Sequence, residues 1–214
     1  MKYIILIILW CTWCTVHSGM ISLTITNYLR DRLGRKYRFY RLFYNVISLT
    51  TMIPIILYGA NLTGQVLFRW DGFLLIVKLI LVITALLLFI LGAIKYDIVH
   101  FFGIRQIKYG SSHSALSKTG AIDTSGILRI TRHPWYLAAI IFIWTGYREM
   151  YVSTLIVNMI LTVYIMIGTV LEERKLIIEH GDNYRDYIAR VSMLFPFKWI
   201  VFKLSLDSKK YMHM

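Results

Sequence analysis

Residues 128–136, LRITRHPWY, place basic side chains and a proline directly before an apolar run. Proline suits the first position of a helix, and the residue before it is extended. We therefore expect a helix to begin at Pro134, with His133 outside it. The first turn of a helix carries free N–H groups and the positive end of the helix dipole. Together with Arg129 and Arg132 this predicts a site for a carboxylate or phosphate, unless the arginines only follow the charge rule of membrane proteins.

Two adjacent carboxylates, Glu172 and Glu173, end the last long apolar run. Acidic side chains at the edge of a membrane span are costly, so they favour a functional role over a solvated helix with surface ion pairs. Adjacent helical positions point about 100° apart. We therefore expect one carboxylate to face the helix bundle and the other to pair with Arg132 or cap a loop.

A pocket with a cationic wall and an acidic wall follows if these segment ends meet. Trp135, Tyr136 and Tyr164 are the aromatic residues available to line it. A ligand that carries an ammonium, a carboxylate and an apolar or aromatic part fits such a pocket. S-adenosylmethionine is a ligand of this kind.

The elements that must position this pocket are membrane helices. Of the 214 residues 57% are hydrophobic, and the mean hydropathy is +0.61, which is typical of a polytopic membrane protein. Crossing a bilayer of roughly 30 Å takes about 20 residues, so four runs are long enough and a fifth needs tilting or shelter from its neighbours. We expect an all-α, five-helix transmembrane bundle with spans at about 3–25, 42–60, 73–94, 134–147 and 152–171.

The positive charge follows the same topology. The formal net charge is +13, and segments 28–41, 95–132 and 172–214 hold six, six and eight of the 24 Lys and Arg residues. Five crossings put all three segments in the cytoplasm, with the N-terminus outside and the C-terminus inside. The charge then reflects topology and attraction to anionic headgroups, and no nucleic acid is expected as a partner. The first span is interpreted as a signal anchor, because no A-x-A-like cleavage site follows it.

Cytoplasmic segments are expected to complete the pocket. Residues 94–107 have the composition of an interfacial segment, and residues 108–126 that of a functional loop. The last membrane helix should continue through the glutamates to Gly181, and Asp182 should be the N-cap of an amphipathic helix. The apolar face of that helix comprises Tyr184, Tyr187, Ile188 and Val191.

The first span carries polar and sulfur-containing side chains. Cys11 and Cys14 form a CxxC pair, which is either a redox or metal pair or two small packing residues. His17 lies three residues after Cys14 on the same face, and a polar group at this depth should face the bundle. His17 is therefore expected to make an interhelical hydrogen bond or to form a pocket wall.

The ordered pattern of SGILRITRHPWYL, EERKL, HGDNYRDY and FPF, within residues 122–197, resembles the integral-membrane methyltransferase superfamily. That superfamily includes isoprenylcysteine carboxyl methyltransferases and phospholipid N-methyltransferases. Its signature is RHPxY, followed by EE and a Gly-x-x-Tyr-x-x-Tyr tail. VHSGM, YRFYRLFYN and VSMLFPF further resemble the branch that holds methanethiol S-methyltransferase and nurim-like proteins. The resemblance implies one membrane domain over 1–214, with a cofactor-binding half at 120–197.

The resemblance also implies the residues of the cofactor site. Leu128 departs from the family, which usually has tyrosine there, and Gly120 and Ile122 stand where the family often has His-x-Leu. The residues implied to bind S-adenosylmethionine are Ile122, Gly126, Arg129, Arg132, His133, Pro134, Tyr136, Glu172 and Glu173.

The implied reaction is methyl transfer from S-adenosylmethionine, and we expect a small thiol as the acceptor. An isoprenylcysteine carboxylate and a phospholipid amine are alternative acceptors. A thiol must lose its proton, so Glu173 and His17 are the candidate catalytic bases. A non-catalytic nurim-like role and a thiol–disulfide role for Cys11 and Cys14 are the other open functions. We expect no metal, and a location in the bacterial inner membrane or in the endoplasmic reticulum or nuclear membrane.

Overall fold

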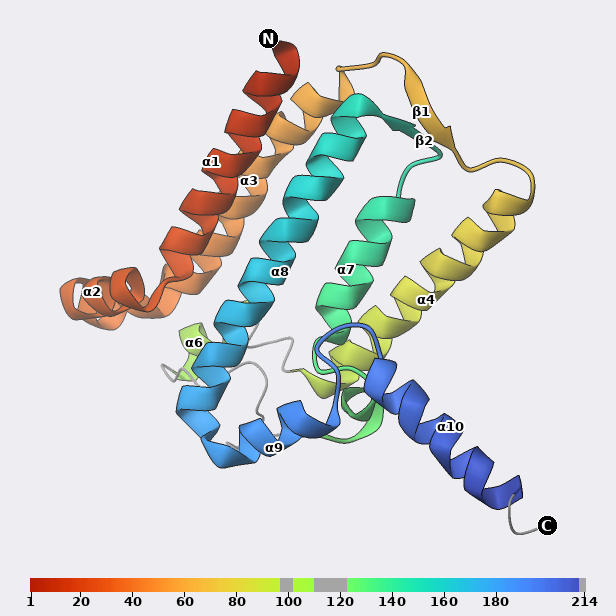
Figure 1. The fold of residues 1–214 in the computed structure, drawn as a ribbon. Coiled ribbons are helices and arrows are strands. Elements are labelled where there is room, and N and C mark those ends of the chain that lie inside the picture. Colours follow the sequence, from red (N-terminus) through yellow and green to blue (C-terminus); the bar gives the residue numbers. More distant parts are fainter. Residues whose placement is uncertain (97–101, 110–122, 212–214) are drawn as a thin grey trace.

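The computed structural model describes residues 1–96, 102–109 and 123–211 (Figure 1). Helices dominate, and two short strands form the only sheet of the described residues. The elements are α1 (Lys2–Ile21), α2 (Leu23–Leu33), the 3₁₀ helix η1 (Gly34–Phe39), α3 (Tyr40–Ala60), β1 (Val66–Arg69), α4 (Phe73–Lys95), α6 (Ile104–Tyr109), the 3₁₀ helix η2 (Gly126–Arg129), α7 (Pro134–Thr145), β2 (Glu149–Tyr151), α8 (Val152–His180), α9 (Asp182–Arg190) and α10 (Phe197–Tyr211).

Helices α1, α3, α4, α7 and α8 run alternately up and down between two ends of the molecule (Figure 1). The N-terminus and both strands lie at one end, which we call the strand end, and α2, α6 and α9 lie at the other, which we call the site end. β1 and β2 are antiparallel, with Val66 opposite Tyr151 and Arg69 opposite Glu149. This pairing ties the connection before α4 to the connection before α8.

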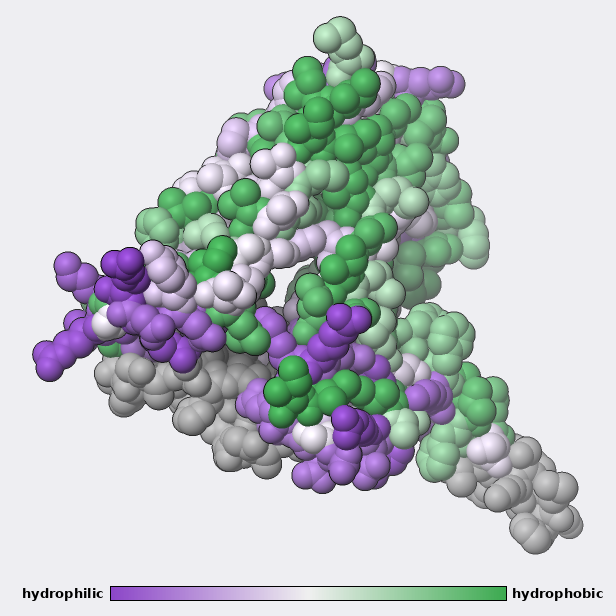
Figure 2. Space-filling model, turned by 60° about the vertical axis from the view of Figure 1, so that its left-hand side comes forward, coloured by the Kyte–Doolittle hydropathy of each residue, from purple (hydrophilic) through white to green (hydrophobic). Residues whose placement is uncertain are grey.

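Four helical regions of the described residues are long and apolar enough to cross a membrane. They are Lys2–Ile21, Leu23–Ala60, Phe73–Lys95 and Val152–His180, and they contain most of the four long apolar runs in the sequence. Figure 2 shows apolar side chains along the helix shafts and hydrophilic ones gathered at the site end. The protein is therefore a multi-pass helical membrane protein.

Helix α7 is shorter than these four, with 12 residues and a length of about 18 Å at 1.5 Å per residue. It packs along α4, where Ala85 and Ala138 have no exposed surface. Gly92 lies under Trp135, whose indole N–H donates to the Phe89 carbonyl at 3.0 Å. Small residues of α4 thus let α7 approach closely. Packing against α4 shields this short helix on one side, as expected for an apolar run that is too short to span the membrane alone.

At the site end, α8 continues past its apolar part through both glutamates to His180, as predicted. Gly181 ends it with a φ of +57°. The prediction that Asp182 is the N-cap of α9 is wrong by one residue, because Gly181 is the cap and Asp182 the first residue of the helix. The predicted apolar face of α9 is confirmed, since Tyr184, Tyr187 and Val191 are buried in a cluster with Leu176 of α8, and Ile188 packs against it.

Candidate active site at the site end

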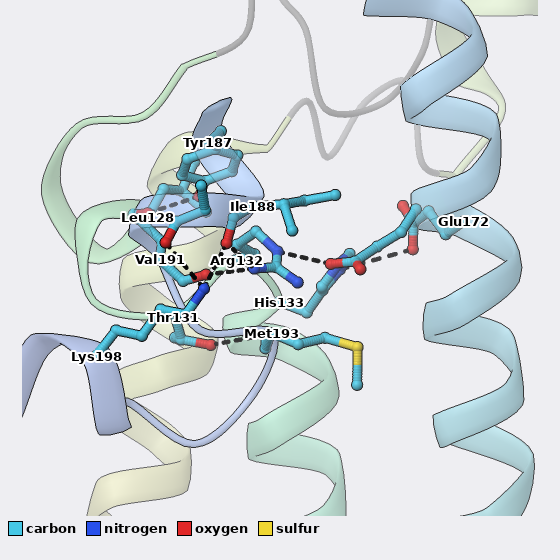
Figure 3. Close-up of polar contacts among 12 residues, drawn as sticks. Leu128, Thr131, Arg132, His133, Glu172, Tyr187, Ile188, Val191, Met193 and Lys198 are labelled. Atoms are coloured by element: carbon cyan, nitrogen blue, oxygen red, sulfur yellow. Dashed lines mark hydrogen bonds and ion pairs between the residues drawn. The ribbon is translucent and has the colours of Figure 1, made fainter. Parts of the chain in front are cut away.

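The start of α7 is held by a segment far along the chain. The backbone N–H of Arg132 donates to the Ser192 carbonyl at 3.0 Å, and that of His133 donates to the Met193 carbonyl at 3.1 Å. Thr131 adds a hydroxyl hydrogen bond to the same Met193 carbonyl at 3.1 Å (Figure 3). α7 begins at Pro134, with His133 as its N-cap, which confirms the predicted helix start. The tail after α9 thus fixes the backbone of the RHP motif.

Arg132 joins the ends of three helices. Its Nε donates to Glu173 Oε1 at 2.6 Å, and its Nη1 donates to the carbonyls of Ile188 and Val191 near the end of α9 (Figure 3). Its side chain is only 5% exposed and that of Glu173 13%. A buried ion pair with these extra hydrogen bonds is costly to break, because removal of one partner leaves an uncompensated charge. Arg132 and Glu173 therefore hold α7, α8 and α9 together.

His133 lies between the two glutamates of α8. Its Nε2 is 3.1 Å from Glu173 Oε1, and its ring stacks on Tyr136 with centroids 5.4 Å apart. Since an ionised carboxylate only accepts hydrogen bonds, Nε2 is the donor in this contact. Nδ1 is then turned toward Glu172, at 3.9 Å from its Oε2.

Glu172 differs from its neighbour in having an unsatisfied oxygen. Its Oε2 is buried and has no hydrogen-bond partner among the described residues. A buried carboxylate oxygen in this state is expensive, because it has lost water and gained no donor. The arrangement therefore favours a ligand that brings a donor or a positive charge to this oxygen.

The segment before the motif is pinned to the end of α4. Lys95 Nζ is 3.0 Å from Asp123 Oδ2 and also donates to Ser125. The Ser125 hydroxyl and backbone N–H donate to Asp123, and with Lys95 they lower the pKa of that carboxyl to about 2. Gly126 follows with a φ of +62°, and a Cβ there would lie 2.9 Å from Lys95 Cε. The positive φ therefore favours glycine at this position, and a larger residue would also displace the end of the Lys95 side chain.

A small pocket, of about 20 Å³, lies beside these residues. Leu128 lines it where the family usually has tyrosine, and the Leu128 carbonyl accepts a hydrogen bond from Tyr187 Oη at 2.6 Å. Burial raises the pKa values of Tyr184 and Tyr187, so both remain neutral donors at physiological pH. The lining residues are Asp123, Leu128, Arg132, His133, Leu176, His180, Tyr184 and Tyr187.

Not every residue implied by the resemblance is brought into this group. Arg132, His133, Tyr136, Glu172 and Glu173 come together. The Arg129 side chain is exposed, and Ile122 lies outside the described residues, as does most of the predicted loop 108–126. The residues that sequence analysis missed are Lys95, Asp123 and His180. Of these three, only His180 could have been found from the sequence, because it lies at the end of the helix that was predicted to continue from the two glutamates.

His17 lies in a second polar group within the bundle. Tyr44 Oη is 2.5 Å from His17 Nε2, and Ser48 Oγ is 3.0 Å from Nδ1, so the expected interhelical hydrogen bond is present toward α3. Trp13 stacks on the His17 ring at 4.7 Å, and Ser18 donates to Tyr164 of α8 at 3.1 Å. We call Trp13, His17, Ser18, Tyr44, Ser48 and Tyr164 the His17 cluster.

The CxxC pair of α1 is in the thiol form, and the described residues form no metal centre. Cys11 and Cys14 are both free thiols, with Cys11 exposed and Cys14 buried. No three His, Cys, Asp or Glu side chains within residues 1–96, 102–109 and 123–211 are grouped so as to hold a metal ion.

The fold defines a multi-pass membrane protein, and comparison with known proteins supports the membrane methyltransferase branch that the motifs resembled. The chain belongs to the NnrU protein family, whose model matches residues 5–204. It is 37% identical to methanethiol S-methyltransferase of Pseudomonas deceptionensis over 99 residues, which cover 45% of this chain and 37% of the relative.

Two further relatives carry the same enzyme name. Methanethiol S-methyltransferase of Crocosphaera subtropica is 31% identical over 139 residues, or 64% of this chain and 49% of the relative. Methanethiol S-methyltransferase 1 of Bradyrhizobium diazoefficiens is 42% identical over 72 residues, or 34% of this chain and 25% of the relative. The matches thus span from a quarter to about half of these relatives. No solved structure matches the chain.

Proposed function

We propose that the protein is an S-adenosylmethionine-dependent membrane methyltransferase that methylates a small thiol. The names of its relatives support a methyltransferase. The observation that carries the cofactor assignment is the buried Glu172 Oε2, which lacks a hydrogen-bond partner among the described residues. The ammonium of S-adenosylmethionine is a donor of the charge and geometry that this oxygen needs.

The chain's own residues divide the work of holding the cofactor. Glu172 receives the ammonium, and the His133–Tyr136 stack supplies an aromatic wall beside it. Arg129, which is exposed, is the cation we propose for the carboxylate, because the guanidinium of Arg132 is already bound to Glu173 and two carbonyls. When bound, S-adenosylmethionine supplies a methyl group activated by its positively charged sulfur.

The His17 cluster is proposed as the acceptor side of the site. A thiol has an ordinary pKa of about 8.5, so a base that takes its proton raises the fraction of thiolate at neutral pH. Of the two candidate bases, Glu173 is engaged by Arg132 and His133. His17 contacts the hydroxyls of Tyr44 and Ser48 and stacks on Trp13, and no charged group is bound to it in the described structure. We therefore propose His17 as the base and Glu173 as a positioning residue.

The two groups share α8. Tyr164 belongs to the His17 cluster, and Glu172 follows it by eight positions, a rise of about 12 Å along the helix axis. A thiol that enters from the membrane reaches the cluster first, while a charged cofactor reaches Glu172 from the polar end. This division matches the solubility of the two proposed substrates.

The proposed topology has five crossings. α7 is the fifth, sheltered by α4, and α1 begins outside while α8 ends in the cytoplasm. The three basic segments then share the cytoplasmic side, as the positive-inside rule demands. The proposal keeps a single domain over 1–214, with the cofactor half at 120–197. A location in the bacterial inner membrane agrees with the bacterial sources of the relatives.

The proposal is tested with purified protein in lipid nanodiscs, methanethiol and S-adenosylmethionine that carries a deuterated methyl group. We expect deuterium-labelled dimethyl sulfide in the headspace, detected by gas chromatography and mass spectrometry. Glu172→Gln and His133→Ala should abolish the product. Absence of product from folded wild-type protein that binds S-adenosylmethionine would reject the thiol acceptor, and labelled lipid in its place would assign the activity to a phospholipid.

A further inference from the structure

A second cavity, of about 160 Å³, lies at the strand end of the bundle, between α1, α3 and α8. Its nearest lining residue on α8, Asn158, precedes Glu172 by 14 residues, a rise of about 21 Å along the helix axis. The cavity is therefore separate from the candidate active site. Its volume is roughly ten times the 10–15 Å³ that a single water molecule needs.

Two polar side chains on the wall of this cavity lack partners. Trp10 Nε1 and Asn158 Nδ2 are buried atoms without a hydrogen-bond acceptor among the described residues. Both residues line the cavity, and they are only 2% and 3% exposed. Both groups are hydrogen-bond donors, and a buried donor without an acceptor is destabilising. The cavity thus offers N–H donors from two helices, and both await an acceptor.

The rest of the cavity lining disfavours a charged ligand. Ile55, Gly59 and Val157 make an apolar lining. The one carboxylate on the lining, Glu149, is neutralised by Arg69 at 2.7 Å and accepts a hydrogen bond from Tyr151 Oη at 2.6 Å. A ligand for this cavity is therefore uncharged, largely apolar, and equipped with an acceptor oxygen.

We propose that this cavity binds a small neutral molecule whose carbonyl oxygen accepts hydrogen bonds from Trp10 and Asn158. A water molecule occupies about 30 Å³ in the liquid, and water in a cavity of this size would leave the apolar lining wetted at a cost. The carbonyl oxygen of a compact ketone would accept hydrogen bonds from the two donors, and its carbon atoms would pack against the apolar lining. The inference does not rest on the proposed methyltransferase activity.

The probe is cyclohexanone, compared with methylcyclohexane, which has the same number of non-hydrogen atoms and no acceptor. The readout is the indole N–H resonance of each tryptophan in ¹⁵N-labelled full-length protein, with Trp10 assigned by Trp10→Phe. Trp13 and Trp144 are internal controls, because their indoles already donate to Thr51 and Thr162.

We expect cyclohexanone to move the Trp10 resonance downfield with saturation, and methylcyclohexane not to. Asn158→Leu should weaken the binding of cyclohexanone by about three- to tenfold, the value of one net hydrogen bond, while Trp144→Phe should leave it unchanged. An equal response to both probes, a response shared by all tryptophans, or no saturable shift in the wild-type protein would overturn the proposal. The wild-type comparison decides the matter even if a variant fails to fold.

Discussion

Glu172 and Glu173 are consecutive on α8 yet differ in what their carboxylates contact. Glu173 Oε1 is 2.6 Å from Arg132 Nε and 3.1 Å from His133 Nε2. Glu172 Oε2 is buried without a hydrogen-bond partner among the described residues. The two glutamates of the RHPxY–EE pattern therefore have different roles. Glu173 holds the helix ends together, and Glu172 is available to a ligand.

The first prediction separates these roles by stability. Glu173→Gln should lower the melting temperature on the order of 10 °C, because a broken buried ion pair costs about 3–5 kcal/mol and each kcal/mol shifts Tm by roughly 2–4 °C in a chain of this size. The matched variant Glu172→Gln should lower Tm less, since the Glu172 side chain is 29% exposed and its Oε2 accepts no hydrogen bond. Thermal unfolding in one detergent measures both, and equal losses in the two variants would contradict the division.

The second prediction concerns the hydrogen bond between Tyr187 and the Leu128 carbonyl. Tyr187→Phe leaves that buried carbonyl without its donor, so it should destabilise the protein by about 1–3 kcal/mol with no change of charge. Tyr58→Phe is the control, because its hydroxyl contacts an exposed backbone carbonyl at the strand end. Thermal unfolding of both variants gives the comparison, and a loss in Tyr58→Phe as large as in Tyr187→Phe would argue against the role of this hydrogen bond.

The third prediction tests His17 as a base. His17→Asn should lower kcat for a thiol by about a hundredfold or more and leave the affinity for S-adenosylmethionine unchanged. The deficit should shrink as the pH approaches 8.5, because the substrate then ionises without help. Initial rates from pH 6.5 to 9 measure this. A deficit that stays constant with pH would mean that His17 only packs or positions.

The fourth prediction is a pH dependence at Asp123. Its folded pKa of about 2 lies below the ordinary value of 3.8, so the carboxylate adds stability above pH 3.8 that is lost as the pH falls toward 2. Asp123→Asn should therefore flatten the fall of Tm between pH 4 and pH 2. Parallel Tm profiles of wild type and variant over that window would refute the link.

The start of α7, the extension of α8 and the buried face of α9 were predictable, because each depends on local rules of proline placement and helical periodicity. The pairing of Arg132 with one of the two glutamates was expected, but the choice of Glu173 depends on how α8 turns against α7. The hydrogen bonds of residues 131–133 to residues 192–193, and of His17 to Tyr44 and Ser48, join segments far apart in sequence. The periodicity of apolar residues within one helix contains no information about such long-range pairings.

The most direct test of the site is a calorimetric titration of the detergent-purified protein with S-adenosylmethionine, run beside Glu172→Gln and a conservative control, Glu179→Gln. The control side chain lies on the same helix outside the pocket and is half exposed. We predict binding to wild type and to Glu179→Gln, with affinity reduced at least tenfold in Glu172→Gln, because a charge-assisted hydrogen bond is worth about 1.5–3 kcal/mol. Equal binding by all three proteins, or no binding to the folded wild type, would contradict the assignment of Glu172 to the cofactor.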